Sequence, residues 1–201
     1  MTLRAVFFDL GGVILRTEYQ APRERLAERL NMTYEDIGKI VFESETARKA
    51  SLGQVSVDEH WLAVTHRLRL PASEVESIRT EFFAGDVIDR DLLNFIRSLR
   101  PRYKTGVISN AWGDLRDYII RHQFDDAFDT IIISAEIGMM KPQPEVYQLA
   151  LKQLQVEADE TAFVDDTSKN IEAANALGMH GIVFRDPVQV RENLKAFMNH
   201  R

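Results

Sequence analysis

Val6-Phe7-Phe8-Asp9-Leu10-Gly11-Gly12-Val13-Ile14-Leu15 carries the strongest local structural signal in this 201-residue chain. The residues before Asp9 are β-branched or aromatic, which predicts a buried strand. Gly11 and Gly12 end that strand, because glycine adopts backbone angles that other residues avoid. A carboxylate is thereby held at the end of a rigid strand, beside bare backbone N–H groups. This arrangement suits a nucleophile that faces a phosphate, and equally a simple turn capped by an aspartate.

The composition is that of an ordinary globular protein, with 45% hydrophobic and 28% charged residues. Its length fits one domain, or one domain with a sizeable insertion. The net charge of −6 and the lack of a long basic run argue against nucleic acid as a partner. Because the sequence contains no cysteine, disulfides, thiolate metal sites and cysteine nucleophiles are excluded.

The amino terminus enters a strand almost at once and lacks the basic region, apolar stretch and cleavage site of a signal peptide. No apolar run approaches the roughly 20 residues of a membrane-spanning helix. We therefore expect a cytoplasmic protein, a monomer or weak homodimer, that does not bind membranes.

After the opening stretch, four consecutive helices without an intervening strand are expected from about Pro22 to Ala84, which predicts a small helical bundle. Pro22, Thr33 and the capping boxes Ser56-Val57-Asp58-Glu59 and Ser73-Glu74-Val75-Glu76 mark the starts of these helices. From 89 onward, helices alternate with short buried strands at 105–108, 130–133, 161–164 and 181–184. This alternation predicts an α/β fold with a parallel sheet covered by helices on both faces. The first strand belongs to the same sheet, so the bundle is an insertion.

Polar side chains stand where the predicted strands end, and in open parallel sheets the ligand site lies at that edge. They are Asp9, Ser109, Asn110, Asp165 and Asp166. Lys141 lies nearby, in the loop after the third strand, 130–133. Three carboxylates at close range repel one another unless cations compensate. Lys141 supplies one positive charge, and Mg²⁺, which prefers oxygen ligands, would supply two more. Such a set is the equipment of phosphoryl transfer.

In this interpretation Asp9 attacks phosphorus and forms an aspartyl phosphate, while Ser109 and the backbone N–H groups after Asp9 hold the phosphoryl oxygens. Simpler interpretations exist for each residue. Asp165 and Asp166 also suit helix caps, Ser109 suits an ordinary turn, and Lys141 suits an exposed loop. Because all these positions fall at the same end of one sheet, the catalytic interpretation is favoured.

The combination resembles the haloacid dehalogenase superfamily over nearly the whole chain. Phe8-Asp9-Leu10-Gly11-Gly12-Val13-Ile14 is similar to the first family motif, and Ile108-Ser109-Asn110 looks like the second. Lys141-Pro142-Gln143-Pro144-Glu145-Val146-Tyr147 looks like the third, and Phe163-Val164-Asp165-Asp166-Thr167-Ser168-Lys169-Asn170 like the fourth. The order and spacing agree, so the resemblance is specific even though the first two motifs are short.

The resemblance implies a Rossmann-like core, residues 1–15 and 85–201, and a four-helix cap, residues 16–84. It implies Mg²⁺ held by Asp9, Asp166 and the backbone carbonyl of Gly11, with Asp165 close by. The site residues that follow from it are Asp9, Ser109 and Lys141 for catalysis and Leu10, Gly11, Ser109, Asn110 and Lys141 for substrate binding.

Gly11 departs from the family pattern. Most phosphatases of the superfamily carry a second aspartate at this position, which protonates the leaving group and then activates water. Such acids contribute roughly 10²–10⁴-fold to the rate. The lack of this acid suits a phosphatase whose leaving group departs easily, such as the anomeric oxygen of a sugar 1-phosphate. Some glucose-1-phosphate and other sugar-1-phosphate phosphatases of the superfamily look similar, with glycine here.

Two other functions stay open. Dehalogenases of the superfamily also lack the second aspartate, but they usually have serines where Asp165 and Asp166 stand. An inactive site would leave a protein that binds phosphorylated metabolites. The paired aspartates favour a metal, so we expect Mg²⁺-dependent hydrolysis of small phosphate esters, best on sugar 1-phosphates. Two segments are expected to help select the substrate: Thr17, Glu18 and Tyr19 just after the first motif, and the cap turn Leu52-Gly53-Gln54. The five histidines show no ligand spacing and are interpreted as structural, with His60 the only one placed where it could reach a substrate. Trp112 is expected to pack at a helix start rather than to line the crevice.

Overall fold

The computed structural model describes residues 3–199 and is built around one parallel sheet. Its five strands are β1 (Ala5–Phe8), β4 (Lys104–Ser109), β5 (Thr130–Ile133), β6 (Thr161–Asp165) and β7 (His180–Val183). They are ordered β5-β4-β1-β6-β7, and every neighbouring pair is parallel. The strand that precedes Asp9 is therefore the central one, which explains why its four residues are all apolar and fully buried.

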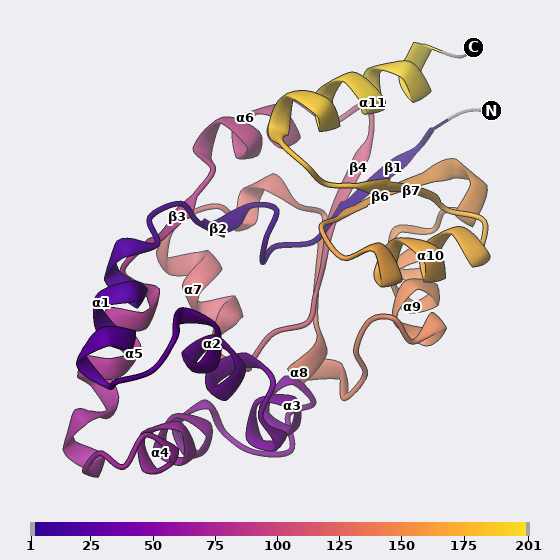
Figure 1. The fold of residues 1–201 in the computed structure, drawn as a ribbon. Helices are drawn as coiled ribbons and strands as arrows, with labels where there is room; N and C mark the ends of the chain where they lie inside the picture. The colour runs from indigo at the N-terminus through magenta and orange to yellow at the C-terminus, as the bar shows by residue number, and fades with distance from the viewer. Residues whose placement is uncertain (1–2, 200–201) are drawn as a thin grey trace.

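Helices cover both faces of this sheet (Figure 1). Val6 and Phe8 pack with α6 (Arg90–Leu99), α7 (Leu115–Arg121) and α11 (Pro187–Asn199). Ala5 and Phe7 point to the opposite face and pack with α9 (Pro144–Leu154) and α10 (Ser168–Ala176). The alternation along β1 follows from the two-residue period of a strand. The expected α/β sheet with two helical layers is confirmed.

Between β1 and β4 the chain forms the cap, a separate group of helices beside the carboxyl ends of the strands (Figure 1). It consists of α1 (Ala21–Arg29), α2 (Tyr34–Phe42), α3 (Glu45–Ser51), α4 (Val57–Arg67) and α5 (Val75–Phe83). The cap has its own buried cluster, to which Leu26, Ile37, Trp61, Ile78 and Phe82 contribute. The inserted helical cap is thus confirmed, but it has five α-helices where the sequence predicts four.

The additional helix arises because the segment expected as one helix from Thr33 to Leu52 is divided at Ser44. The Ser44 hydroxyl accepts a hydrogen bond from the Ala47 N–H at 3.2 Å and so caps a new helix, α3. The capping box at Ser56 is present as predicted, with Glu59 as its partner. The box predicted at Ser73 does not form, because this residue lies in a 3₁₀ turn, Ala72–Glu74, before α5.

Two short strands join the cap to the core, β2 (Leu15–Thr17) and β3 (Asp86–Ile88). They pair antiparallel, with Thr17 opposite Asp86 and Leu15 opposite Ile88. The sequence predicts no strand at either place. We propose the division into a core of residues 1–15 and 85–201 and a cap of residues 16–84, whose boundaries fall in or beside this ladder. Within residues 3–199, no helix is both long and apolar enough to span a bilayer.

Candidate active site

Asp9 directly follows the central strand, and its backbone N–H still pairs with the Val164 carbonyl of β6 at 2.8 Å. The residue as a whole is 8% exposed. Asp9 Oδ1 accepts the Leu10 N–H at 2.7 Å and lies 2.9 Å from Lys141 Nζ. Among residues 3–199, no hydrogen bond reaches Asp9 Oδ2. One carboxylate oxygen is therefore fixed, which orients the other for chemistry.

Lys141 is the cation of the site, and it is 2% exposed. Its Nζ lies between Asp9 Oδ1, at 2.9 Å, and Asp165 Oδ2, at 2.6 Å. The ammonium also stands 5.3 Å from the centroid of the Phe163 ring. A buried ammonium needs such partners, because its desolvation is costly when unpaired. The alternative of an exposed loop lysine is wrong for this residue.

Asp165 is fully buried at the end of β6, and its oxygens are already occupied by donors of the protein. Oδ1 accepts the Thr167 N–H at 2.8 Å, and Asn170 Nδ2 lies 3.1 Å from Oδ1 and 3.0 Å from Oδ2. Tyr147 in turn donates its hydroxyl to the Asn170 carbonyl at 2.9 Å. Asp165 therefore holds Lys141 in place. Because its oxygens are occupied by protein donors, it suits a position beside the metal ligands rather than among them.

Asn170 and Thr167 lie within the fourth sequence motif, but the sequence gives them no role. The available signal was their position just after two aspartates, in the turn that begins α10. Only the fold shows that both donate to the same carboxylate.

Asp166 completes a group of three carboxylates with Asp9 and Asp165, in which one oxygen of each lies within 4.8 Å of the others. It is exposed, unlike the other two. Its carboxylate lies over Gly12, where an added Cβ would stand 2.2 Å from Asp166 Oδ2. Gly12 has φ +76°, a conformation that favours glycine. The glycine thus provides both the turn and the space for Asp166.

The charges in this cluster do not balance, because three carboxylates face one lysine. Burial raises the pKa of Asp9 to about 7, with a further contribution from Asp165, although Lys141 opposes the shift. Partial desolvation of its carboxylate and the neighbouring Asp165 also raise the pKa of Asp166, although the residue is exposed at the surface. A divalent cation would remove this excess of negative charge, and carboxylate oxygens are the ligands that Mg²⁺ prefers. The residues present therefore fit a magnesium ion.

The predicted phosphate-binding residues lie at the same edge of the sheet. Ser109 is the last residue of β4, the strand paired with β1, and is 4% exposed. Asn110 follows it, and its side-chain amide is bonded to the backbone of Lys141. At Gly11, an added Cβ would find no atom within 4 Å. Space at Gly11 is therefore open, so sterics do not account for the lack of an aspartate there.

The structure places two other candidates, His60 and Trp112, in the cap and away from the carboxylate cluster. His60 is fully buried inside the cap, with Nδ1 3.0 Å from Thr46 Oγ1, so it does not face the site. Trp112 also packs into the cap, with its ring centroid 4.5 Å from that of His60 and 6.0 Å from that of Phe42. His60 is thus the structural residue that the sequence predicts, because aromatic side chains of the cap enclose its ring, and it does not reach a substrate.

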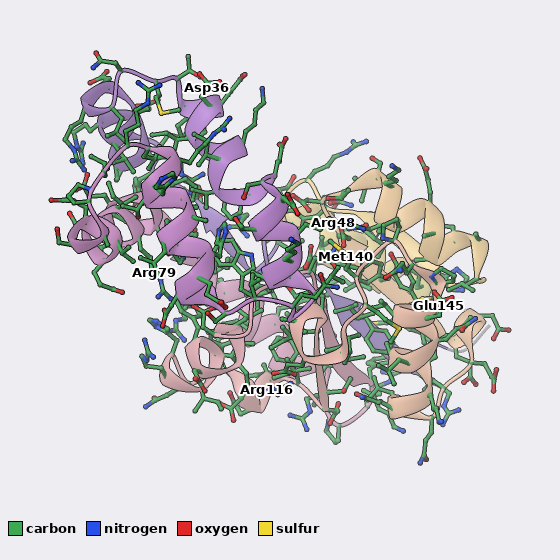
Figure 2. The ribbon with its side chains drawn as sticks, turned by 90° about the horizontal axis from the view of Figure 1, so that it is seen from below. Asp36, Arg48, Arg79, Arg116, Met140 and Glu145 are labelled. Carbon is green, nitrogen blue, oxygen red and sulfur yellow. The ribbon has the colours of Figure 1, made fainter. Side chains whose placement is uncertain are left out.

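The cap turn at Gly53 lies where the cap meets the core, since a Cβ there would stand 2.2 Å from the Ala135 carbonyl oxygen. The turn, including Gln54, lines a cavity of about 370 Å³ with Gly113 and Ala135 on the core side. Arg48 of α3 and Met140, which precedes Lys141, are labelled near each other in the view from below (Figure 2). The role of this cap turn in substrate selection stays a prediction.

The family model described as haloacid dehalogenase-like hydrolase matches residues 3–178. A sesquiterpene phosphatase of Aspergillus oryzae is 30% identical over 92% of this chain and 91% of its own. The bifunctional epoxide hydrolase 2 of Rattus norvegicus is 27% identical over 97% of this chain, which spans only 39% of that longer protein. The D-ribitol-5-phosphate phosphatase of Bacteroides thetaiotaomicron is 24% identical over 98% of this chain and 99% of its own.

Among solved structures, a predicted hydrolase of this type from Porphyromonas gingivalis aligns over 100% of both chains with a TM-score of 0.79 and 21% identity. A related enzyme from Bacteroides thetaiotaomicron, solved with magnesium and inorganic phosphate, aligns with a TM-score of 0.72 and 19% identity over 91% of this chain and 94% of its own. These likenesses agree with the fold described above.

Proposed function

Because the chain belongs to the haloacid dehalogenase-like hydrolases, we propose that it is a Mg²⁺-dependent phosphatase that cleaves small phosphate monoesters through an aspartyl phosphate on Asp9. The relatives named as phosphatases support this choice. So does the cluster of three carboxylates, which a metal-free dehalogenase does not require.

The carboxylate of Asp9 is the observation that carries the proposal. Its Oδ1 is held by Leu10 N–H and Lys141 Nζ, while Oδ2 accepts no hydrogen bond from residues 3–199. An oxygen without a protein donor, open to the site, is available to attack phosphorus. Rigid β1 on one side and Lys141 on the other fix its direction.

In the first step, Asp9 Oδ2 attacks phosphorus, and the bond from phosphorus to the leaving oxygen breaks. The leaving oxygen takes a proton from water and departs as the alcohol, and the phosphoryl group stays on Asp9. Water then attacks the same phosphorus, and the bond from phosphorus to Asp9 Oδ2 breaks. Inorganic phosphate leaves, the Asp9 carboxylate is restored, and the proton lost by the attacking water returns to the solvent. Lys141 Nζ and the Ser109 hydroxyl donate to the phosphoryl oxygens, joined by N–H groups of the glycine loop.

Asp9, Asp166 and the Gly11 carbonyl would hold the magnesium ion, which supplies positive charge beside the phosphoryl oxygens. Asp165 keeps the lysine between the two carboxylates and contributes negative charge nearby. Leu10 and Gly11 contribute backbone groups beside the substrate.

The glycine at position 11 supports the finer proposal that the substrates are sugar phosphates, with sugar 1-phosphates the best. Without a carboxylic acid at this position, the leaving oxygen must depart with less assistance. The anomeric oxygen of a sugar is a more stable leaving group than a simple alkoxide. The relative named for D-ribitol 5-phosphate adds support for phosphorylated carbohydrates in general.

A panel of phosphate monoesters tests the proposal, with release of inorganic phosphate measured in Mg²⁺ and again in excess chelator. The panel contains sugar 1-phosphates, a sugar-alcohol 5-phosphate and an isoprenyl phosphate, the last because one relative is named a sesquiterpene phosphatase. We expect Mg²⁺-dependent turnover, highest on sugar 1-phosphates. Asp9→Asn should abolish it, whereas Asp91→Asn, at an exposed position on α6, should not.

Three results would contradict the proposal. Full activity of Asp9→Asn would show that the mechanism is wrong. Chloride release from a 2-haloacid without metal would establish a dehalogenase. Binding of sugar phosphates without any turnover would leave a binding protein.

A further inference from the structure

The side chain of Asn110 is bonded to the backbone of a residue 31 positions away. Its Oδ1 accepts the Lys141 N–H at 2.7 Å, and its Nδ2 donates to the Lys141 carbonyl at 2.9 Å. The amide thus contacts both peptide groups of one residue, as a neighbouring strand would. This residue carries the cation of the site, and Asn110 directly follows Ser109 at the end of β4.

The bonds matter because a lysine side chain is a point charge on a flexible stem. Two carboxylates fix its Nζ, with Asp9 at 2.9 Å and Asp165 at 2.6 Å. No strand or helix fixes its backbone, since Lys141 lies in the loop between α8 (Ser134–Ile137) and α9. Asn110 supplies that missing anchor and connects the loop to the rigid sheet.

We infer that Asn110 is a positioning residue, which acts on the phosphoryl group through Lys141. Resemblance to the family assigned it to substrate binding. In the structure, its oxygen and one of its two amide hydrogens are committed to the Lys141 backbone. The inference rests on the proposed function, because it assigns the phosphate-facing role to Lys141.

Loss of the anchor should move the lysine rather than remove it. Misplacement of a catalytic group by about 1 Å lowers rates by roughly 10²-fold. Asn110→Ala should therefore reduce kcat/KM by about that factor. If Asn110 acts only through Lys141, the same substitution should have almost no effect once the Lys141 side chain is gone.

A double-mutant cycle tests this inference. The wild type, Asn110→Ala, Lys141→Ala and the double variant are compared by kcat/KM on an activated aryl phosphate in Mg²⁺, which keeps the weakest variant measurable. We expect about 10²-fold between the first two and less than about 3-fold between the last two. Equal losses in both backgrounds would overturn the inference, because they would show that Asn110 contacts the substrate itself.

Binding of inorganic phosphate in the presence of Mg²⁺, measured by calorimetry, repeats the cycle without turnover. This measurement separates the proposed phosphatase function from the positioning role of Asn110. A wild type that turns nothing over contradicts the proposed function, while the binding cycle still confirms or refutes the role of Asn110. Asn94→Ala, which removes an exposed amide on α6, is the matched control and should behave as the wild type. If Asn110→Ala does not fold, Asn110→Ser takes its place in both cycles. Equal losses with and without the Lys141 side chain would again refute the inference.

Discussion

Replacing Gly12 by alanine tests whether the Asp166 carboxylate belongs to the metal site. A Cβ on Gly12 would lie 2.2 Å from Asp166 Oδ2 and 2.6 Å from Asp166 Cγ. Ordinary contact between such atoms needs about 3.5 Å, so the carboxylate must shift by roughly 1 Å. The position of Asp166 relative to Asp9 would change, and with it the cluster that lies within 4.8 Å.

Two effects of different size follow. The backbone of Gly12 has φ +76°, and an L-residue in that region costs about 1–2 kcal/mol. For a chain of this length, this corresponds to a fall in Tm of about 2–8 °C. Displacing a metal ligand should cost more in function than in stability. We expect at least about 10-fold weaker Mg²⁺ binding, because even residues behind the ligands contribute 10–100-fold.

Calorimetric titration with Mg²⁺ and thermal unfolding measure the two effects separately. Gly113→Ala is the matched control, because a Cβ there meets no atom within 4 Å. It should change stability by less than about 0.5 kcal/mol and leave Mg²⁺ binding unaltered. If Gly12→Ala lowers Tm yet binds Mg²⁺ as the wild type does, Asp166 is not a ligand and the reasoning fails.

Three further substitutions test other parts of the structure. Gly11→Asp has room for its side chain and should accelerate hydrolysis of an alkyl phosphate by about 10²-fold or more, but that of a sugar 1-phosphate by less; equal gains on both would refute the account of the missing acid. Burial lowers the pKa of His60 below 6.5, so the unfolded chain binds more protons just below this pH, and Tm should fall on acidification. His60→Gln should flatten that dependence, and parallel curves for both proteins would contradict it. Gly53→Ala should destabilise the protein by about 1–2 kcal/mol and alter KM, because φ at Gly53 is +68° and the added Cβ would meet Ala135. Gly38→Ala, whose Cβ meets no atom within 4 Å, is the control, and equal unfolding and kinetics of the two variants would disprove this.

Local sequence signals were enough to predict the parallel sheet and the edge at which the site lies. Apolar runs as in Val6–Phe8 and 161–164 are local signals of buried strands, and the helical spacing between them is equally local. Parallel strands place their carboxyl ends together, so Asp9, Ser109 and Asp165 could be assigned to one edge before any contact was known. The family motifs then restricted the chemistry.

The pairing of these residues, in contrast, depends on how distant segments pack in the folded protein. Lys141 contacts Asp9 and Asp165, and Asn110 contacts the Lys141 backbone, across separations that local periodicity does not encode. The ladder of β2 and β3 was missed because strands of three residues are too short to show alternation.

The cap shows the same limit. Ser44 divides one expected helix because its hydroxyl competes for a backbone N–H, and the sequence alone did not reveal which of several serines would do so. His60 has a polar side chain, yet the aromatic residues packed around it remove it from the site. Local sequence thus specifies which residues can take part, while packing between distant segments specifies which of them meet.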